Sequence, residues 1–446
     1  MDFDLSGPPS AAAEDGTWLA CIECGATVAP FDGPTYRCPD CGGLLEVRYD
    51  DYPDWRDFGS AGERTDADAG ERTDADAGEG STPGGHPRHD GVWRYADALP
   101  VEREVTIEEG DTPLYDVPRL QAATGVRTLR VKHEGMNPTG SFKDRGMTVG
   151  VGVARRIGVD RLAVASTGNT SAALATYGAR TGMETLVLLP AGKVAAGKVA
   201  QASLHGARIL EVDGNFDDCL DVVSDLADKG EAYLLNSLNP FRLEGQKTIG
   251  LEILEQARDD YGRLPDRIVL PVGNAGNTAA IHKAFRELVA AGALAPGEVP
   301  TLTGVQAAGA APFVEAIEEG RESVRRWDDV ETRATAIRIG DPVNAPKALH
   351  AVRETGGTAV AVPDEAITRA QRDLAGEGLG VEPASAASLA GLRELRERGV
   401  VDESEDVVLL TTGHLLKDPD AAAAAGTEPE PVGATTEAVL DHLRGA

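Results

Sequence analysis

Short apolar runs that alternate with longer stretches of helical spacing fill most of the chain after Gly91. The runs are RLAVAS (161–166), TLVLLP (185–190), ARILEVD (207–213), AYLLN (232–236), RIVLPVG (267–273), TAVAV (358–362) and DVVLLTT (406–412). Strands that are apolar throughout are buried on both faces, and their alternation with helices is typical of a mainly parallel sheet. We therefore predict an α/β fold with its ligand site beyond the carboxyl ends of the strands.

The segment 216–226 illustrates the helices between these runs. Its apolar side chains recur at helical spacing and share one face: Phe216, Cys219, Leu220, Val223 and Leu226. Because Cys219 lies on this apolar face, we predict that it is a small buried residue rather than a nucleophile.

The charge of the chain limits its partners. Its 446 residues include 43 Lys and Arg against 73 Asp and Glu, a formal net charge of −30, and only 9 of the cations are Lys. Such a surface repels nucleic acid and anionic lipid, so we expect no nucleic acid partner. An acidic surface poor in Lys also stays hydrated in concentrated salt, where charge repulsion is screened, so we expect salt adaptation.

The length and the N-terminus suggest a soluble protein of several units. A chain of 446 residues is longer than one typical domain. No uninterrupted apolar run approaches the roughly 18 residues that cross a bilayer. The start, MDFDLSGPPSAAAEDG, has neither the basic nor the apolar region of a signal peptide. We expect no membrane partner and a cytoplasmic location.

Four of the five cysteines form two Cys-x-x-Cys pairs, Cys21 with Cys24 and Cys38 with Cys41. Each pair is followed by Gly, which relieves the strain of a turn that directs two thiolates to one point. Two such turns complete a tetrahedral site of four sulfurs. We predict a structural zinc ribbon over residues 18–52, with a rubredoxin-like iron site or two redox dithiols as the alternatives.

Residues 53–92 are predicted to form an acidic flexible linker. The octapeptide GERTDADA occurs twice in tandem, at 62–69 and 70–77, and Gly-rich sequence follows it. His86 and His89 have metal-like spacing, but no third ligand is near, so we expect solvated histidines. We expect a disordered N-terminus over residues 1–17 and a ribbon that moves independently on this linker.

Two predicted strands are followed by turns rich in Gly, Ser, Thr and Asn. RLAVAS leads into residues 167–171, TGNTS, and RIVLPVG leads into residues 273–277, GNAGN. The second turn is the better anion site, because its glycines let backbone N–H groups converge at the positive end of a helix. It has neither the Lys-Ser/Thr of a nucleotide P-loop nor the glycine order of a dinucleotide fold.

A third turn, GMNPTGSFKDR at 135–145, contains Lys143. Ser141 stands where a P-loop would require Lys, so ATP binding is disfavoured. A lysine in a tight turn of Gly, Ser and Phe is a candidate Schiff-base residue. The alternative is a surface lysine paired with Asp144. A fourth turn at 411–414, TTGH, offers hydroxyls for a neutral ring nitrogen. A lysine for an aldehyde, a Gly/Asn turn for a phosphate and a hydroxyl for a pyridine nitrogen together match pyridoxal phosphate.

Eight motifs, in this order, resemble the threonine synthase family: NPTGSFKDRGM, STGNTSA, NSLNPFRLEGQKT, PVGNAGNT, QAAGAAPF, IRIGDPVN, VEPASAASLAGL and TTGHLLKD. The resemblance implies a pyridoxal-phosphate enzyme of fold type II with two subdomains over residues 93–420. The smaller subdomain would span roughly 146–245, and a tail with a short helix would span 421–446. Some members carry a similar zinc ribbon. The resemblance also implies a homodimer.

Carried over by position, the resemblance assigns roles to individual residues. Lys143 would hold the cofactor's aldehyde, Asn169 would contact its 3-oxygen, and Thr412 would bind its ring nitrogen. The cofactor phosphate would lie on Gly273, Asn274, Ala275, Gly276 and Asn277. Leu415 departs from the pattern, because Gly usually follows TGH in the family, and this puts the ring contact in question.

The implied reaction converts O-phospho-L-homoserine and water to L-threonine and phosphate, with Lys143 transferring protons. The substrate phosphate needs a second anion site, for which the candidates are Ser166, Thr167, Thr170, Asn236, Ser237, Asn239 and Arg242. The alternative for Arg242 is a salt bridge on a helix surface. Rival functions are a related pyridoxal enzyme acting on O-phosphoserine or threonine, and a zinc-ribbon protein that binds nucleic acid, which the net charge opposes.

Overall fold

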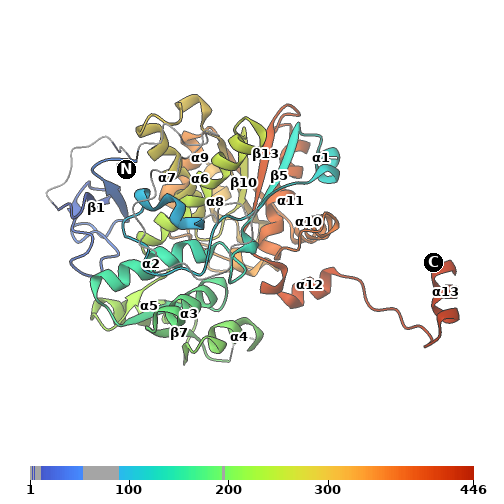
Figure 1. Cartoon of the computed structure of the whole chain (residues 1–446), viewed down its shortest axis with the longest axis horizontal. Coiled ribbons are helices and arrows are strands. Elements are labelled where there is room, and N and C mark those ends of the chain that lie inside the picture. The colour runs from blue at the N-terminus through green and yellow to red at the C-terminus, as the bar shows by residue number, and fades with distance from the viewer. Residues whose placement is uncertain (1–2, 4, 6–11, 54–89, 193–195, 446) are drawn as a thin grey trace, which may run out of the picture.

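A computed structural model describes residues 3, 5, 12–53, 90–192 and 196–445 of the chain. Two sheets, one mainly and one entirely parallel, and the helices around them make up the body, and a small antiparallel sheet packs on one side of it (Figure 1). The predicted linker, the GERTDADA repeats, His86 and His89 lie almost entirely outside the described residues. Among the described residues no helix is long and apolar enough to cross a membrane.

The larger sheet has the strand order β12-β11-β10-β13-β5-β4. Its strands are β4 (Leu114–Asp116), β5 (Thr128–His133), β10 (Arg267–Pro271), β11 (Thr301–Ala307), β12 (Thr358–Val362) and β13 (Asp406–Thr411). Every pairing is parallel except that of β4 with β5. Three of the six strands, β10, β12 and β13, coincide with predicted apolar runs, and β13 and β5 are neighbours although almost 280 residues separate them.

The smaller sheet has the order β8-β7-β6-β9 and is entirely parallel. Its strands are β6 (Arg161–Ala165), β7 (Glu184–Pro190), β8 (Arg208–Val212) and β9 (Tyr233–Leu234). All four coincide with predicted runs and lie within residues 146–245. The prediction of a mainly parallel α/β fold is confirmed.

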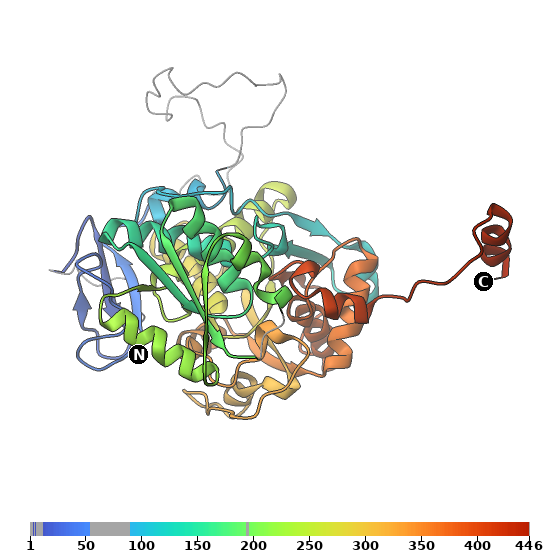
Figure 2. The same cartoon turned by 90° about the horizontal axis from the view of Figure 1, so that it is seen from below.

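Thirteen α-helices in the described part of the chain connect and cover these strands. They are α1 (Pro118–Thr124), α2 (Lys143–Ile157), α3 (Asn169–Thr181), α4 (Ala196–Leu204), α5 (Phe216–Asp228), α6 (Phe241–Tyr261), α7 (Gly276–Ala290), α8 (Pro312–Glu318), α9 (Ala345–Glu354), α10 (Asp364–Gly376), α11 (Pro383–Glu397), α12 (Pro419–Ala425) and α13 (Thr436–Gly445). Helix α6 is buried along most of its length because it packs against both α2 and α7. Helix α13 stands apart from the body in both views (Figures 1 and 2).

Helix α5 bears out most of the predicted apolar face. Cys219 and Val223 are fully buried against the smaller sheet. Phe216 was predicted to share this face, but 41% of it is exposed, so that part of the prediction is wrong. Phe216 is the first residue of the helix, directly after the capping residue Asn215, and this turn projects beyond the buried face.

The ribbon comprises β1 (Thr17–Cys21), β2 (Thr27–Val28) and β3 (Leu45–Tyr49), in the order β2-β1-β3. Its buried side chains belong to the same hydrophobic cluster as the smaller sheet and the start of α6. The expectation of an independently moving ribbon is therefore wrong, because separation would expose this shared core to water. Figure 2 shows the ribbon strands, in blue, directly against the body.

Candidate active site

The predicted site turns lie at the carboxyl ends of five parallel strands. The turn with Lys143 follows β5, residues 166–169 follow β6, residues 235–240 follow β9, residues 272–275 follow β10, and residues 412–414 follow β13. Strands β10, β13 and β5 are consecutive neighbours in the larger sheet, and β6 and β9 are neighbours in the smaller one. Each sheet therefore brings its own turns together, at the edge where ligands bind in such folds.

The turns after β5 and β13 are hydrogen-bonded to each other. Phe142 N donates to the carbonyl of Thr412 at 3.0 Å, and His414 N donates to the carbonyl of Gly140 at 2.9 Å. A β-bridge between Ser141 and Gly413 lies between these two bonds. This backbone contact places Lys143, the first residue of α2, beside Thr412.

Desolvation of Lys143 lowers the pKa of its amine to about 7. The positive charge of Arg242 also lowers this pKa, and the carboxylate of Glu382 raises it. Among the described residues, no ion pair or hydrogen bond joins Lys143 to Asp144. The Asp144 carboxylate instead accepts hydrogen bonds from Thr139 N at 2.7 Å and Thr139 Oγ1 at 2.5 Å. The alternative of a surface ion pair is therefore wrong. An amine with a pKa near neutrality can gain and lose a proton at physiological pH.

Thr412 is buried, and Ser385 at the start of α11 fixes its hydroxyl. Ser385 Oγ accepts hydrogen bonds from the N–H groups of Thr412 and Gly413, both at 2.8 Å, and lies 3.0 Å from Thr412 Oγ1. With two donors already on Ser385 Oγ, its own proton can go to Gly413 O, at 3.2 Å, or to Thr412 Oγ1. The Thr412 proton is then free to point to a ring nitrogen, as an unprotonated pyridine requires.

The GNAGN turn has the properties of an anion site. Ala275 adopts the left-handed conformation, with φ of 63°, and α7 begins directly after it. Both amide atoms of Asn277 and the hydroxyl of Thr278 are buried, and none of these atoms has a hydrogen-bond partner within the described residues. Buried polar atoms are rarely left unpaired, so these atoms point to a missing ligand. Together with Lys143 and Thr412, the turn fits a pyridine ring that carries an aldehyde and a phosphate.

Glu382 is a site residue that our sequence reasoning missed. Asn169 Nδ2 donates to both of its carboxylate oxygens at 3.1 Å, and Lys143 and Lys417 lie close enough to act on its charge. Burial raises the pKa of Glu382. A Cβ at position 413 would lie 2.5 Å from this carboxylate, which explains the glycine there. The available signal was the motif VEPASA, whose carboxylate precedes a helix of small residues.

Arg242 lies in the first turn of α6 and is 2% exposed. Its Nε and Nη2 atoms have no hydrogen-bond partner in the described part of the chain. Desolvation lowers the pKa of its guanidinium to about 10, so the group stays charged at neutral pH. The alternative of a surface salt bridge is therefore wrong. A buried cation without a carboxylate is expensive unless an anion joins it.

The other predicted substrate residues fall into two groups. The amide of Asn236 exchanges two hydrogen bonds of 3.0 Å with the backbone of Ala165, and the amide of Asn239 bonds to Leu234 O and Phe241 N. These two side chains tie the turn to β6, to β9 and to α6. Ser166, Thr167, Thr170 and Ser237 are half-buried, and their place in a phosphate site stays a prediction.

Leu415, the departure from the family pattern, is accommodated by another glycine. Leu415 N donates to Gly380 O at 3.1 Å, and a Cβ at Gly380 would lie 2.0 Å from Leu415 Cδ2. The leucine therefore occupies the space that a side chain at position 380 would take. The hydrogen bonds between Thr412 and Ser385 are present with leucine at position 415.

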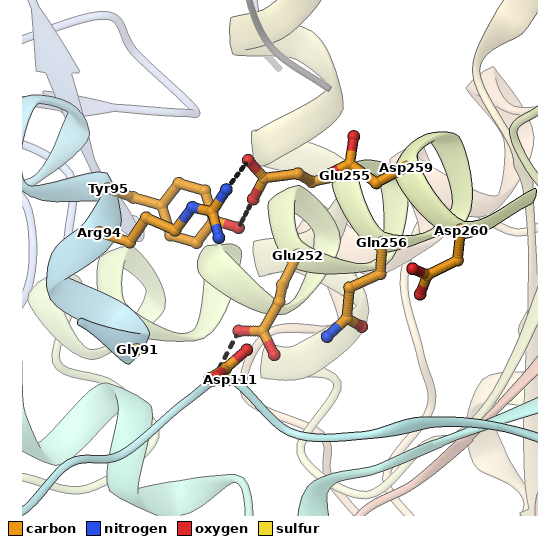
Figure 3. Close-up of a pocket in the computed structure, with 9 residues that line it drawn as sticks. All are labelled: Gly91, Arg94, Tyr95, Asp111, Glu252, Glu255, Gln256, Asp259 and Asp260. Carbon is orange, nitrogen blue, oxygen red and sulfur yellow. Dashed lines mark hydrogen bonds and ion pairs between the residues drawn. The ribbon is translucent and has the colours of Figure 1, made fainter. Parts of the chain in front are cut away.

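A crevice of about 190 Å³ contains none of the predicted site residues in its lining. Its lining is acidic, with Asp111, Glu252, Glu255, Asp259 and Asp260 around Arg94 and Tyr95 (Figure 3). Glu255 accepts hydrogen bonds from both Arg94 and Tyr95 there. A negative lining of this kind disfavours a phosphorylated ligand.

The four ribbon cysteines converge as predicted. Their sulfur atoms all lie within 4.8 Å of one another, with Cys21 to Cys41 at 3.5 Å and Cys24 to Cys38 at 3.6 Å. The glycines after the two pairs, residues 25 and 42, have φ of 73° and 74°, which is the strain that glycine relieves. Four sulfurs at these distances could hold one tetrahedral metal ion.

Comparison with known proteins agrees with this geometry. Residues 105–413 match the family of pyridoxal-phosphate dependent enzymes. A threonine synthase of Methanosarcina acetivorans is 53% identical over 429 residues, which cover 96% of this chain and 98% of that protein. The chain belongs to the threonine synthase family. A threonine synthase of Methanocaldococcus jannaschii is 51% identical over 92% of this chain and 95% of its own.

Solved structures of other enzymes share the fold. Threonine deaminase isoform 2 of Solanum lycopersicum has a TM-score of 0.60 at 23% identity, over 71% of this chain and 88% of that one. Diaminopropionate ammonia lyase of Escherichia coli has a TM-score of 0.61 at 15% identity, over 73% and 91%. At such identities these likenesses concern the fold alone, and the assignment within it rests on the threonine synthases.

Proposed function

We propose that this member of the threonine synthase family converts O-phospho-L-homoserine and water to L-threonine and phosphate. The observation that carries the proposal is the pair formed by Lys143 and Arg242. The amine of Lys143 has a pKa near neutrality, and Nε and Nη2 of the buried Arg242 have no hydrogen-bond partner among the described residues. The two groups lie close enough for the charge of Arg242 to lower the pKa of Lys143. The reaction needs both, because it transfers protons at carbon and expels a phosphate.

Pyridoxal phosphate, when bound, supplies an electron sink for negative charge at the substrate carbons. Its phosphate would lie on Gly273 to Asn277, its ring nitrogen at Thr412, and its 3-oxygen near Asn169. The unpartnered amide of Asn277 and the Thr412 hydroxyl support these assignments. Lys143 would hold the cofactor through its amine.

Two side chains carry the remaining chemistry. Once released from the cofactor, Nζ of Lys143 would accept and return the protons at Cα and Cβ of the substrate, which its pKa of about 7 allows at neutral pH. Arg242 binds the γ-phosphate and keeps it oriented while the C–O bond breaks. The hydroxyls of Ser166, Thr167, Thr170 and Ser237 would complete the phosphate site, and Asn236 and Asn239 would hold its backbone in shape.

The alternative is a pyridoxal enzyme that acts on O-phosphoserine or dehydrates threonine. The threonine deaminase fold neighbour makes a dehydratase a natural comparison. A threonine substrate carries no phosphate, so a dehydratase would give the buried Arg242 guanidinium no phosphate oxygen to bind. We therefore prefer a phosphorylated substrate.

The deciding experiment measures phosphate and amino-acid products together. O-phosphohomoserine should yield threonine and phosphate in equal amounts, and O-phosphoserine and threonine should be turned over much more slowly. A preference for O-phosphoserine, or release of a keto acid from threonine, would replace the proposed reaction with one of the alternatives.

Three further proposals concern the whole molecule. The ribbon binds one structural zinc, in keeping with its four converging sulfurs. The protein is a homodimer, as the family resemblance implies, which light scattering would test. It works in the cytoplasm, in keeping with its likeness to biosynthetic enzymes.

A further inference from the structure

The ribbon touches the catalytic body at the segment that carries the proposed phosphate site. Tyr36 Oη accepts a hydrogen bond of 2.7 Å from Leu234 N, and the Tyr36 ring lies against that of Tyr233. Phe31 stacks on Phe241, with ring centroids 5.9 Å apart. Tyr36 and Phe31 thus hold the two ends of the turn between β9 and α6.

The contact at Leu234 completes the edge of a sheet. Strand β9 is the outer strand of the smaller sheet and pairs with β6 on one side alone. An outward N–H on an edge strand needs water or another acceptor. The buried phenol of Tyr36 supplies that acceptor, so the ribbon substitutes for the next strand at this point.

The same turn carries the side chains that shape the phosphate site. Asn239 bonds to Leu234 O at one end and to Phe241 N at the other. Arg242 follows Phe241 directly, and its Cγ lies against Gly150 of α2, where a Cβ would approach it to 3.3 Å. Movement of β9 or of the first turn of α6 therefore moves the Arg242 guanidinium.

Tyr36 is close to the cysteine turns in sequence and belongs to the same buried cluster. Tyr36 lies two residues before Cys38, one of the four converging cysteines, and Cys38 N donates to Gly43 O at 2.9 Å. Cys21 and Cys38 belong to the hydrophobic cluster that also contains Phe31, Tyr36 and Phe241. The path from the cysteine site to the Arg242 turn is thus continuous and buried.

We propose that the N-terminal ribbon is a positioning element for the substrate-phosphate site, in which Tyr36 and Phe31 hold the segment from Leu234 to Arg242 in its binding conformation. This inference rests on the proposed role of Arg242. It assigns the ribbon a part in substrate affinity, beyond the stability that a structural metal supplies.

The test is Tyr36→Phe in the full-length holoenzyme. The exchange keeps the ring but leaves Leu234 N–H without its acceptor. We expect KM for O-phosphohomoserine to rise roughly three- to thirtyfold, and Kd for inorganic phosphate, measured by calorimetry, to rise by the same factor. The reason is that an unpaired buried N–H at Leu234 favours a rearranged conformation of the turn between β9 and α6. The Kd of pyridoxal phosphate and the metal content should stay at wild-type values. Phe31→Leu should act in the same direction.

Tyr52→Phe is the matched control. Tyr52 is also on the ribbon and packs edge-on against Tyr49, and among the described residues it has no hydrogen bond or ring contact with the turn between β9 and α6, so its exchange should leave both constants unchanged. Wild-type phosphate affinity in Tyr36→Phe would overturn the proposal. Equal losses of phosphate and cofactor affinity would also overturn it, in favour of a general structural role. If Arg242→Leu binds phosphate with wild-type affinity, the proposed role of Arg242 in substrate binding is wrong. That result distinguishes a failure of the proposed function from a failure of the ribbon proposal.

Discussion

A buried guanidinium without a carboxylate costs a folded protein stability, so its presence calls for a compensating ligand. Arg242 is such a group, and desolvation lowers its pKa without removing its charge. Asn277 and Thr278 show the same incomplete pairing at the neighbouring turn. At the scale of single residues, polar atoms without a hydrogen-bond partner among the described residues support the two proposed anion sites.

Replacement of Arg242 should separate substrate binding from cofactor binding. We expect Arg242→Leu to lower kcat/KM for O-phosphohomoserine about ten- to a hundredfold, because a charge-assisted hydrogen bond is lost. Arg242→Lys should recover only part of this, since it restores charge without the planar guanidinium. The measurements are steady-state kinetics and a titration with pyridoxal phosphate.

An exposed arginine provides the control for this exchange. Arg326 pairs with Asp217 and Asp328 at the surface, so Arg326→Leu should leave the kinetics unchanged. The thermal midpoint of Arg242→Leu should not fall, because the exchange removes an uncompensated buried charge. Equal losses of cofactor affinity and substrate use would assign Arg242 to the scaffold.

The pH dependence of cofactor uptake should report on Lys143. Only the neutral amine can attach the aldehyde, and the lowered pKa makes it neutral above about pH 7. Uptake by the cofactor-free protein should therefore quicken as pH rises through about 7 and then level off. Arg242→Leu removes a charge that lowers this pKa, so its midpoint should move to higher pH.

The readout is the visible absorbance that appears when cofactor attaches. Lys143→Ala should lack this absorbance and keep its circular dichroism, and Lys229→Ala, which changes an exposed lysine, should behave as wild type. An unchanged spectrum in Lys143→Ala would refute the assignment of Lys143. A midpoint near pH 10 in the wild type would refute the desolvated state of its amine.

At the scale of elements, the ribbon and the smaller sheet act as one packed unit. Strands β1 and β3 contribute Leu19, Leu45 and Val47 to the cluster that covers the small sheet. Lys347 of α9 donates to Leu45 O at 2.7 Å, and Arg286 of α7 pairs with Glu46. The ribbon therefore also packs against two helices of the larger subdomain.

Loss of the ribbon metal should lower the stability of the whole protein. Metal analysis should find one equivalent in the wild type and none after Cys38→Ser with Cys41→Ser. Since the ribbon core is shared, the thermal midpoint of the catalytic body should fall as well. Cys219→Ala should keep the metal, because Cys219 lies in α5, away from the four cysteines. Metal absent from protein purified without chelator would contradict this prediction.

At the scale of the whole molecule, the acidic composition affects how the protein behaves in salt solution more than it affects the fold. The net charge of −30 repels itself at low ionic strength, and salt screens that repulsion. The tandem GERTDADA repeats concentrate acidic residues in a stretch that has too few apolar side chains for a core. Salt adaptation stays a prediction.

Deletion of residues 62–77 should leave turnover unchanged. The segment precedes every predicted catalytic turn, and its composition suits a spacer. The measurement is kcat of the shortened protein and the full chain at matched salt, with the metal content as the control for an intact ribbon. A large fall in kcat with metal still bound would show that the repeats act in catalysis.

Local sequence patterns were enough to predict many of the strands and candidate site turns of this protein. Side-chain periodicity and turn composition act over a few residues, so the apolar runs predicted seven strands and the turns after them. The same local chemistry singled out Lys143, the GNAGN turn and the four cysteines. The shorter or less uniform strands β4, β5 and β11 escaped, because their apolar pattern is broken by polar and charged side chains.

Only the tertiary structure decided which distant residues meet. Asn169 and Glu382 are 213 positions apart, and Tyr36 and Leu234 are 198 apart. Contacts at such separations depend on how helices and sheets pack, which no local pattern encodes. Packing therefore determined that Glu382 faces Lys143, that Arg242 is buried rather than at the surface, and that the ribbon is docked on the body.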